Sequence, residues 1–120
     1  MLEGEQEQII QIIIEAIFEK KGQDVKLLEL KDLTTIADYF VICSAESDMQ
    51  VKAIADNIDD SLSKAGIKVW KKEGFKALSW VLIDLSDIVV HVFRNESRQF
   101  YNLERLWGDA PIKEIIDPLK

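Results

Sequence analysis

Hydrophobic residues recur at two different periods along this chain, and the two periods predict its helices and strands. Residues 6–21 carry apolar side chains three and four positions apart, which places them on one face of an α-helix. These residues are Ile10, Ile13, Ile14, Ile17 and Phe18. Acids stand near the start of this segment and Lys20 and Lys21 near its end, as the helix dipole favours. Gly22 ends the helix.

A second helix follows a recognisable start signal. Ser47 and Gln50 have the spacing of a capping box, in which the serine side chain accepts a hydrogen bond from a backbone N–H of the first turn. Helical spacing of apolar residues then continues to Gly66. The apolar positions are Val51, Ile54, Ala55, Ile58 and Leu62.

Five short segments have the composition of β-strands. They are residues 25–30, 39–45, 67–72, 80–85 and 88–93. The second is apolar almost throughout, which is typical of a central strand covered on both faces. The third alternates polar and apolar residues, so we expect it nearer an edge of the sheet.

The last predicted helix runs from about residue 96 to residue 107 and closes at Gly108. Phe100, Leu103 and Trp107 form one stripe along it, and we assign Phe100 and Leu103 to the core. Tyr101, Glu104 and Trp107 fit the rim of the core and a contact surface equally well. The tail, residues 109–120, contains both prolines and is expected to be weakly structured.

This order of elements predicts an α/β fold. We expect a single domain over residues 1–120, with a core from about residue 6 to residue 108 and a mixed five-stranded sheet flanked by helices. The connection from the second strand through a helix to the third is long enough for a right-handed crossover. The later strands are joined too tightly to be anything but antiparallel.

The hairpin in the last third allows its strand pairing to be written down. If Ser86 and Asp87 form a two-residue turn, one face of the hairpin is purely apolar. The opposite face pairs Trp80 with Phe93, Leu82 with His91, and Asp84 with Val89. That mixed face suits a surface covered by a helix, with His91 and Asp84 held by local hydrogen bonds. It also suits a protein-binding surface, since Trp beside polar groups is common at interface hot spots.

The net charge of the chain indicates the kind of partner it binds, and its first residues and apolar runs indicate its cellular compartment. Lys and Arg number 15 against 22 Asp and Glu, for a formal net charge of −7. This acidity disfavours direct nucleic-acid binding and favours a basic partner. The first residues are acidic, unlike a signal peptide, and no apolar run reaches membrane-spanning length. We therefore expect a cytoplasmic protein that does not enter a membrane.

Candidates for chemistry are few. The chain has one cysteine and one histidine, so a zinc site is excluded, and Cys43 in an apolar strand is expected to be a buried, inert thiol. Asp59 and Asp60 fit a solvated helix face, and neither phosphate-binding glycine loop is present. Ser44 and Ser47 suit capping better than anion binding, since acids flank them. The sequence predicts no catalytic residue, metal or cofactor.

Three motifs together resemble one known family. DVKLLELKDLTTIADYFVICSAES, WVLIDLSDIVVHVF and RQFYNLERLWGDA occur in this order, and the resemblance to the ribosomal silencing factor or Iojap-related family covers about residues 6–110. It implies a nucleotidyltransferase-like fold without the catalytic residues. It further implies binding to the large ribosomal subunit, through its ribosomal protein number fourteen at the intersubunit face. Such docking would block joining of the small subunit and so repress translation.

Carried onto this chain, the resemblance implies partner-binding residues in the second and third motifs. They are Trp80, Asp84, Tyr101, Glu104 and Trp107, with Asp87 and Asp109 as peripheral acids. Homodimers away from the ribosome are a further expectation.

The kinship with nucleotidyltransferases also raises an enzyme alternative. Active members of that fold have glycine and serine, or two glycines, after the first catalytic strand, and an Asp-x-Asp pair for metal. Here the strand ends in Cys43, Ser44 and Ala45, and no acidic pair follows on a strand. The sequence also lacks glycines that many family members have where it reads CSAES and DLSD, which concerns loop geometry. A binding protein that is not an enzyme is therefore our prediction.

Overall fold

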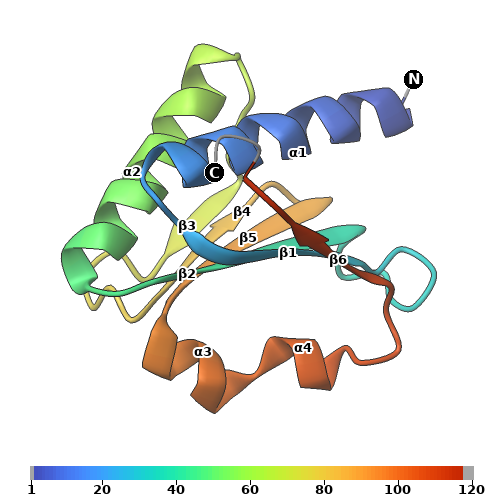
Figure 1. Cartoon of the computed structure of the whole chain (residues 1–120). Helices are drawn as coiled ribbons and strands as arrows, with labels where there is room; N and C mark the ends of the chain where they lie inside the picture. Colours follow the sequence, from blue (N-terminus) through green and yellow to red (C-terminus); the bar gives the residue numbers. More distant parts are fainter. Residues whose placement is uncertain (1, 118–120) are drawn as a thin grey trace.

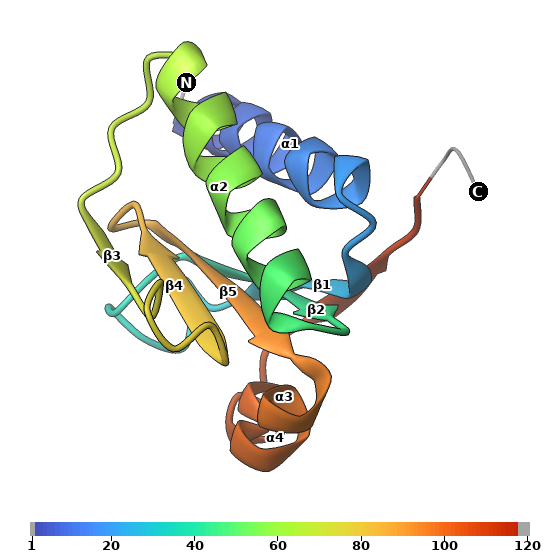
Figure 2. The ribbon, with the colours of Figure 1, turned by 90° about the vertical axis from the view of Figure 1, so that its left-hand side faces the viewer.

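The computed structural model describes residues 2–117, with side chains for residues 4–117. Within them, one mixed sheet has the strand order β3-β4-β5-β2-β1-β6. The strands are β1 (Gln23–Glu29), β2 (Tyr39–Ala45), β3 (Lys71–Glu73), β4 (Trp80–Asp84), β5 (Ile88–Arg94) and β6 (Ile112–Ile115). The helices are α1 (Leu2–Glu19), α2 (Asp48–Lys64), α3 (Asn95–Tyr101) and α4 (Leu103–Leu106). Helices α1 and α2 cover one face of the sheet, and α3 and α4 lie on the other (Figures 1 and 2).

The strand pairing follows the predicted connections. β2 and β5 are parallel, and every other neighbouring pair is antiparallel. The chain leaves β2, crosses the sheet through α2 and enters β3 at the far edge. The α/β class and the mixed sheet are thus confirmed.

The predicted count of five strands is wrong, because the tail adds a sixth. β6 lies within residues 109–120, the segment expected to be weakly structured, and pairs with β1 from Val25↔Ile115 to Leu28↔Ile112. Ile115 packs against the core on the α1–α2 side of the sheet. An unpaired β1 would leave its backbone donors and acceptors open at the sheet edge, and β6 satisfies them.

The main core lies between the sheet and the first two helices. The apolar faces predicted for both helices are buried there, with Ile13, Ile17, Ile54 and Ile58 fully enclosed. Ser47 caps α2 as predicted, since its Oγ accepts a hydrogen bond from the Gln50 backbone N–H at 3.1 Å. Burial of this continuous apolar layer is the main stabilising term of the fold.

The second helical layer is shorter and broken. The helix predicted over residues 96–107 is interrupted at Asn102, which adopts the left-handed conformation with φ 46°. Asn tolerates this conformation better than most residues, and its Oδ1 accepts a hydrogen bond from the Arg105 backbone N–H, which starts α4. The break changes the direction in which the following side chains point.

Candidate functional site

The hairpin of β4 and β5 has the register written from the sequence. Trp80 pairs with Phe93, Leu82 with His91, and Asp84 with Val89. The backbone N–H of Leu85 donates to the Ile88 carbonyl at 2.9 Å, which closes the two-residue turn. The face that carries Trp80 turns away from α1 and α2, toward α3 and α4.

Aromatic rings form a continuous row on this second face of the sheet. Trp107 meets Phe40 with ring centroids 6.2 Å apart, and Phe40 meets His91 at 4.5 Å. His91 lies 5.8 Å from Trp80, whose ring lies 4.7 Å from that of Tyr101. The row thus connects α4 to the end of α3 across the sheet.

Trp80 is fixed on several sides. Its ring stacks on Phe93 with a centroid separation of 4.9 Å, and its Nε1–H donates to His91 Nδ1 at 3.1 Å. The residue is half-buried. A large aromatic group that is rigid before binding loses little conformational entropy when a partner covers it.

His91 is held in its neutral form by this environment. It is 3% exposed, and burial lowers the pKa of its imidazole to about 4. Because Nδ1 accepts from Trp80, the proton of the neutral ring is assigned to Nε2, which finds no partner among the described residues. Local hydrogen bonds were expected to hold His91, and among the described residues only Nδ1 has such a bond.

The assignment of Phe100 to the core is wrong. Phe100 is 81% exposed, whereas Leu103 is buried as predicted. A stripe at helical spacing requires an unbroken helix, and the left-handed Asn102 separates Phe100 from the positions that follow it. Phe100 instead stands edge-on to Tyr101, with ring centroids 5.1 Å apart, and Tyr101 is half exposed. Trp80, Phe100 and Tyr101 together are called the aromatic surface below.

Glu104 points inward, toward a buried arginine. Its Oε2 accepts from Arg98 Nε at 3.2 Å and from Arg98 Nη2 at 2.9 Å. Arg98 is 6% exposed, and its Nη1 donates to Ser44 Oγ and to the backbone carbonyl of Asp24. Asp24 has φ 51° at an irregularity in the pairing of β1 with β2. Glu104 therefore anchors Arg98 beneath α3.

Sequence reasoning missed Arg98, because an arginine in a polar helix has the pattern of a solvent-facing residue. The same guanidinium lies close enough to Cys43 to lower its pKa slightly, but burial dominates and raises it to about 12. Cys43 is fully buried. The prediction of a buried thiol is confirmed, although its surroundings include a cation that the sequence did not indicate.

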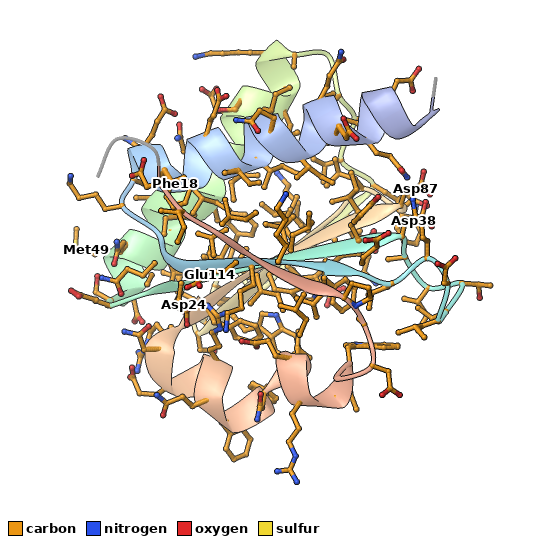
Figure 3. The ribbon with its side chains drawn as sticks, turned by 45° about the vertical axis from the view of Figure 1, so that its right-hand side comes forward. Phe18, Asp24, Asp38, Met49, Asp87 and Glu114 are labelled. Carbon is orange, nitrogen blue, oxygen red and sulfur yellow. The ribbon has the colours of Figure 1, made fainter. Side chains whose placement is uncertain are left out.

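The remaining predicted residues lie elsewhere. Asp84 Oδ1 accepts from the Ser86 backbone N–H at 2.7 Å, and the Asp87 carbonyl accepts from the Asp38 backbone N–H at 2.7 Å. Figure 3 shows Asp87 and Asp38 at the opposite end of the sheet from Asp24. Half-buried Trp107 and exposed Asp109 follow α4. The predicted set thus divides between two ends of one sheet face, and within it the rings of Trp80 and Tyr101 are in contact.

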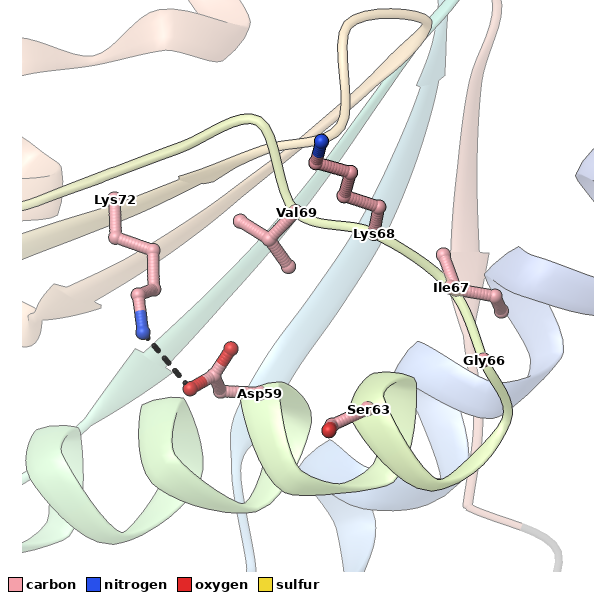
Figure 4. A pocket seen from close by; sticks show the side chains of 7 residues that line it. All are labelled: Asp59, Ser63, Gly66, Ile67, Lys68, Val69 and Lys72. Carbon is pink, nitrogen blue, oxygen red and sulfur yellow. Dashed lines mark hydrogen bonds and ion pairs between the residues drawn. The ribbon is translucent and has the colours of Figure 1, made fainter.

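Two hollows open on the surface that the structure describes. One, of about 450 Å³, is lined by polar residues around Arg98 and Glu104. The other, of about 350 Å³, lies between the end of α2 and the segment before β3 (Figure 4). Among the described residues no three His, Cys, Asp or Glu side chains gather as a metal site would require, and none of their helices has the length and apolarity to span a bilayer.

Known proteins match this chain over nearly its whole length. The family described as "Ribosomal silencing factor during starvation" matches residues 3–120. The ribosomal silencing factor RsfS of Bacillus subtilis is 46% identical over 110 residues, covering 92% of this chain and 93% of that protein. The chloroplastic protein Iojap of Zea mays is 36% identical over 103 residues, which are 86% of this chain and 45% of the maize protein.

Solved structures agree with this match. A crystal structure from Bacillus halodurans superposes with a TM-score of 0.80 at 38% identity, covering 91% of this chain and 99% of that one. A second, from Chromobacterium violaceum, has a TM-score of 0.83 at 32% identity and covers 95% of both chains. Sequence motifs, whole-chain similarity and fold agree, and the chain belongs to the ribosomal silencing factor family.

Proposed function

We propose that this protein silences ribosomes by docking on the large subunit through the aromatic surface and blocking the small subunit from joining. The observation that supports the proposal is that the exposed rings of Phe100 and Tyr101 lie next to the rigidly held ring of Trp80. Phe100 is 81% exposed and Tyr101 50%, and the Tyr101 ring contacts the fixed ring of Trp80 at a tilted angle of 44°. Membership of a family of silencing factors supplies the ribosome as the target.

The charge of the surroundings favours a basic partner. Glu96, on the same helix as Phe100, shares Arg94 with Asp48, at 2.7 Å and 2.8 Å, so the two exposed carboxylates and one guanidinium carry a net charge of −1. The contact with Arg94 also lowers the pKa of Glu96. Acidic groups at a rim steer a cationic protein surface toward a central aromatic contact. A ribosomal protein has such a surface, and we propose protein fourteen of the large subunit as the partner.

The proposed contact set differs from the predicted one. Trp80 and Tyr101 remain as anchors, and Phe100 joins them. Glu104 acts indirectly by holding Arg98 under α3, while Asp84, Asp87, Trp107 and Asp109 would extend the contact toward the other end of the sheet. No catalytic step is needed, since a bound domain excludes the small subunit by its volume.

The test measures binding of the purified protein to isolated large subunits by cosedimentation. Phe100→Ala is the sharpest variant, because a side chain so exposed contributes little to folding. We expect it to weaken docking about tenfold, and Trp80→Ala to weaken it by about 2 kcal/mol or more if the ring is a hot spot. Met49→Ala is the matched control, since Met49 is 83% exposed at the start of α2, in the other helical layer.

Circular dichroism and thermal unfolding must show that Trp80→Ala is folded before its loss of docking is counted. Docking that is equally strong for Phe100→Ala, Tyr101→Ala and Met49→Ala would reject the aromatic surface as the contact. Saturating wild-type protein that leaves joining of the separated subunits unchanged would reject silencing itself.

A further inference from the structure

Positive charge gathers in one short segment of this acidic chain. Residues 64–76 hold five of the 15 Lys and Arg residues but only one of the 22 Asp and Glu residues. The segment therefore carries a formal charge of +4, and the rest of the chain carries −11. The negative net charge of the chain therefore includes one positively charged segment. Such a segment is expected where a protein contacts a polyanion.

The fold places this charge along one edge of the sheet. β3 is the outermost strand, and all five lysines are exposed around it. They are Lys64, Lys68, Lys71, Lys72 and Lys76, which together with Trp70 are called the basic edge. Figure 2 shows this segment descending from the end of α2 into β3, beside β4.

Two of the lysines are not neutralised within the described part of the chain. Lys64, Lys71 and Lys72 form ion pairs with Asp60, Glu73 and Asp59 at 2.9–3.0 Å. Lys68 and Lys76 have no ion pair or hydrogen bond with any residue that the structure describes. In Figure 4 the Lys72 ammonium reaches Asp59, while that of Lys68 points away from this carboxylate. The basic edge thus offers cations for an external anion.

Trp70 adds a flat aromatic ring to these cations. Its side chain is 69% exposed, yet its backbone N–H donates to the Asp84 carbonyl at 2.8 Å, so the exposed ring stands on a backbone that is held against β4 just before β3 begins. The Lys71 ammonium lies 5.8 Å from the ring centroid. An accessible ring beside lysines matches the stacking platforms of proteins that bind single-stranded nucleic acid, where bases stack and cations contact phosphates.

We propose that the basic edge binds single-stranded RNA, with an unpaired base stacked on Trp70 and phosphates contacted by Lys68 and Lys76. Single-stranded RNA uses both features of the basic edge, because its bases stack on an exposed indole while its phosphates contact the lysines. An acidic protein is the competing occupant, and the experiment below distinguishes the two. The proposal extends the proposed function, because a protein docked on a ribosomal subunit lies next to exposed RNA. It also revises the expectation, drawn from net charge, that the chain avoids nucleic acid.

The basic edge and the aromatic surface can be tested separately because their side chains come from different segments, residues 64–76 for the first and β4 with α3 for the second. Lys72 points toward α2, where it pairs with Asp59. Trp80 faces the opposite side, toward α3. Variants of one surface should leave the other intact.

The experiment titrates the full chain into a fluorescein-labelled, unstructured RNA of about twelve nucleotides and follows anisotropy from low to physiological salt. We expect Lys68→Gln/Lys76→Gln to weaken binding and to reduce the slope of log K against log salt by about 1.4, which is 0.7 for each lost phosphate contact. Trp70→Ala should weaken binding about tenfold, within the range for one stacked base. Lys20→Gln/Lys21→Gln is the matched control, since it removes two exposed lysines at the end of α1.

Equal RNA binding by the wild type, Trp70→Ala and the double Lys68 and Lys76 variant would overturn the inference. So would equal competition by polyglutamate of matched charge together with no effect of Trp70→Ala, a result that indicates an acidic protein partner. Phe100→Ala should bind the free RNA like the wild type. Loss of RNA binding therefore reports on the basic edge alone, and failure of subunit docking reports on the proposed function.

Discussion

At the scale of single residues, the structure shows two buried groups whose ionisation is set by desolvation. His91 and Cys43 lie on neighbouring strands, 3% and 0% exposed. Burial disfavours the charged form of each, so the pKa of the imidazole falls to about 4 and that of the thiol rises to about 12. Both shifts lead to predictions that can be checked on the intact protein.

His91 should make folding stability depend on pH between about 6.5 and 4. In this window the unfolded chain binds a proton at the imidazole and the folded chain does not, so stability falls as pH falls. The loss should be on the order of 3 kcal/mol at the acidic end. Urea unfolding of the wild type and of His91→Gln at several pH values measures the difference. Since the chain has one histidine, its proton NMR signal gives the folded pKa directly, and a value near 6.5 would contradict this prediction.

Cys43 should react with maleimide only when the protein opens. A thiol that is fully buried and has a raised pKa has neither access nor thiolate, so labelling at pH 7.5 should be much slower than that of the unfolded chain. Mass spectrometry over time measures the rate, with urea-unfolded protein as the reference. Labelling of the native chain within seconds would show that β2 is accessible.

At the scale of elements, the break between α3 and α4 decides what the molecule exposes. Asn102 holds φ 46° and caps α4, and this geometry separates the exposed Phe100 from the buried Leu103. A continuous helix would have placed the two on one stripe, as the sequence pattern suggested. The left-handed conformation of Asn102 thus leaves Phe100 exposed as part of the aromatic surface.

Two substitutions of Asn102 should separate the effect of its side-chain cap from the effect of its left-handed backbone conformation. Asn102→Ala loses the cap and the local side-chain hydrogen bonding that helps Asn tolerate left-handed backbone, so we expect a loss of about 2 kcal/mol in unfolding free energy. Asn102→Gly keeps the backbone geometry and should cost less than about 1 kcal/mol. Urea unfolding of both variants provides the comparison. The reverse order of stabilities would mean that the turn does not depend on φ.

At the scale of the whole molecule, the proposed block of subunit joining requires only that a folded domain stay bound to the large subunit. The described chain measures 36 × 33 × 31 Å, the size of an obstacle between two subunits rather than of a short peptide plug. Excluded volume acts once for each bound copy and does not consume a substrate. The alternative, a nucleotide-dependent reaction, would be catalytic.

Inhibition of subunit joining should therefore be stoichiometric and independent of added nucleotide. Sucrose-gradient profiles of separated subunits, with increasing protein and with or without ATP and magnesium, measure it. We expect inhibition to saturate at about one copy per large subunit. Complete inhibition at a small fraction of that ratio, or only with ATP, would favour an enzyme.

The sequence by itself determined the features that depend on local periodicity. It placed both long helices, the cap at Ser47, the central strand 39–45 and the register of the hairpin from Trp80 to Phe93. These follow from spacings of two, three and four residues, which backbone geometry converts into faces. The burial of Cys43 belongs here too, because a continuous apolar strand has no exposed side.

Only the tertiary structure decided the features that depend on distant partners. β6 forms because β1 has an open edge, and Arg98 is buried because Ser44, Asp24 and Glu104 converge on its guanidinium. Phe100 is exposed because one backbone angle changes at Asn102. The lysines of residues 64–76 are local in sequence, but the outer strand β3 makes them an edge. Each of these features depends on which surfaces pack together, and a local sequence pattern does not specify contacts between residues that are distant in the chain.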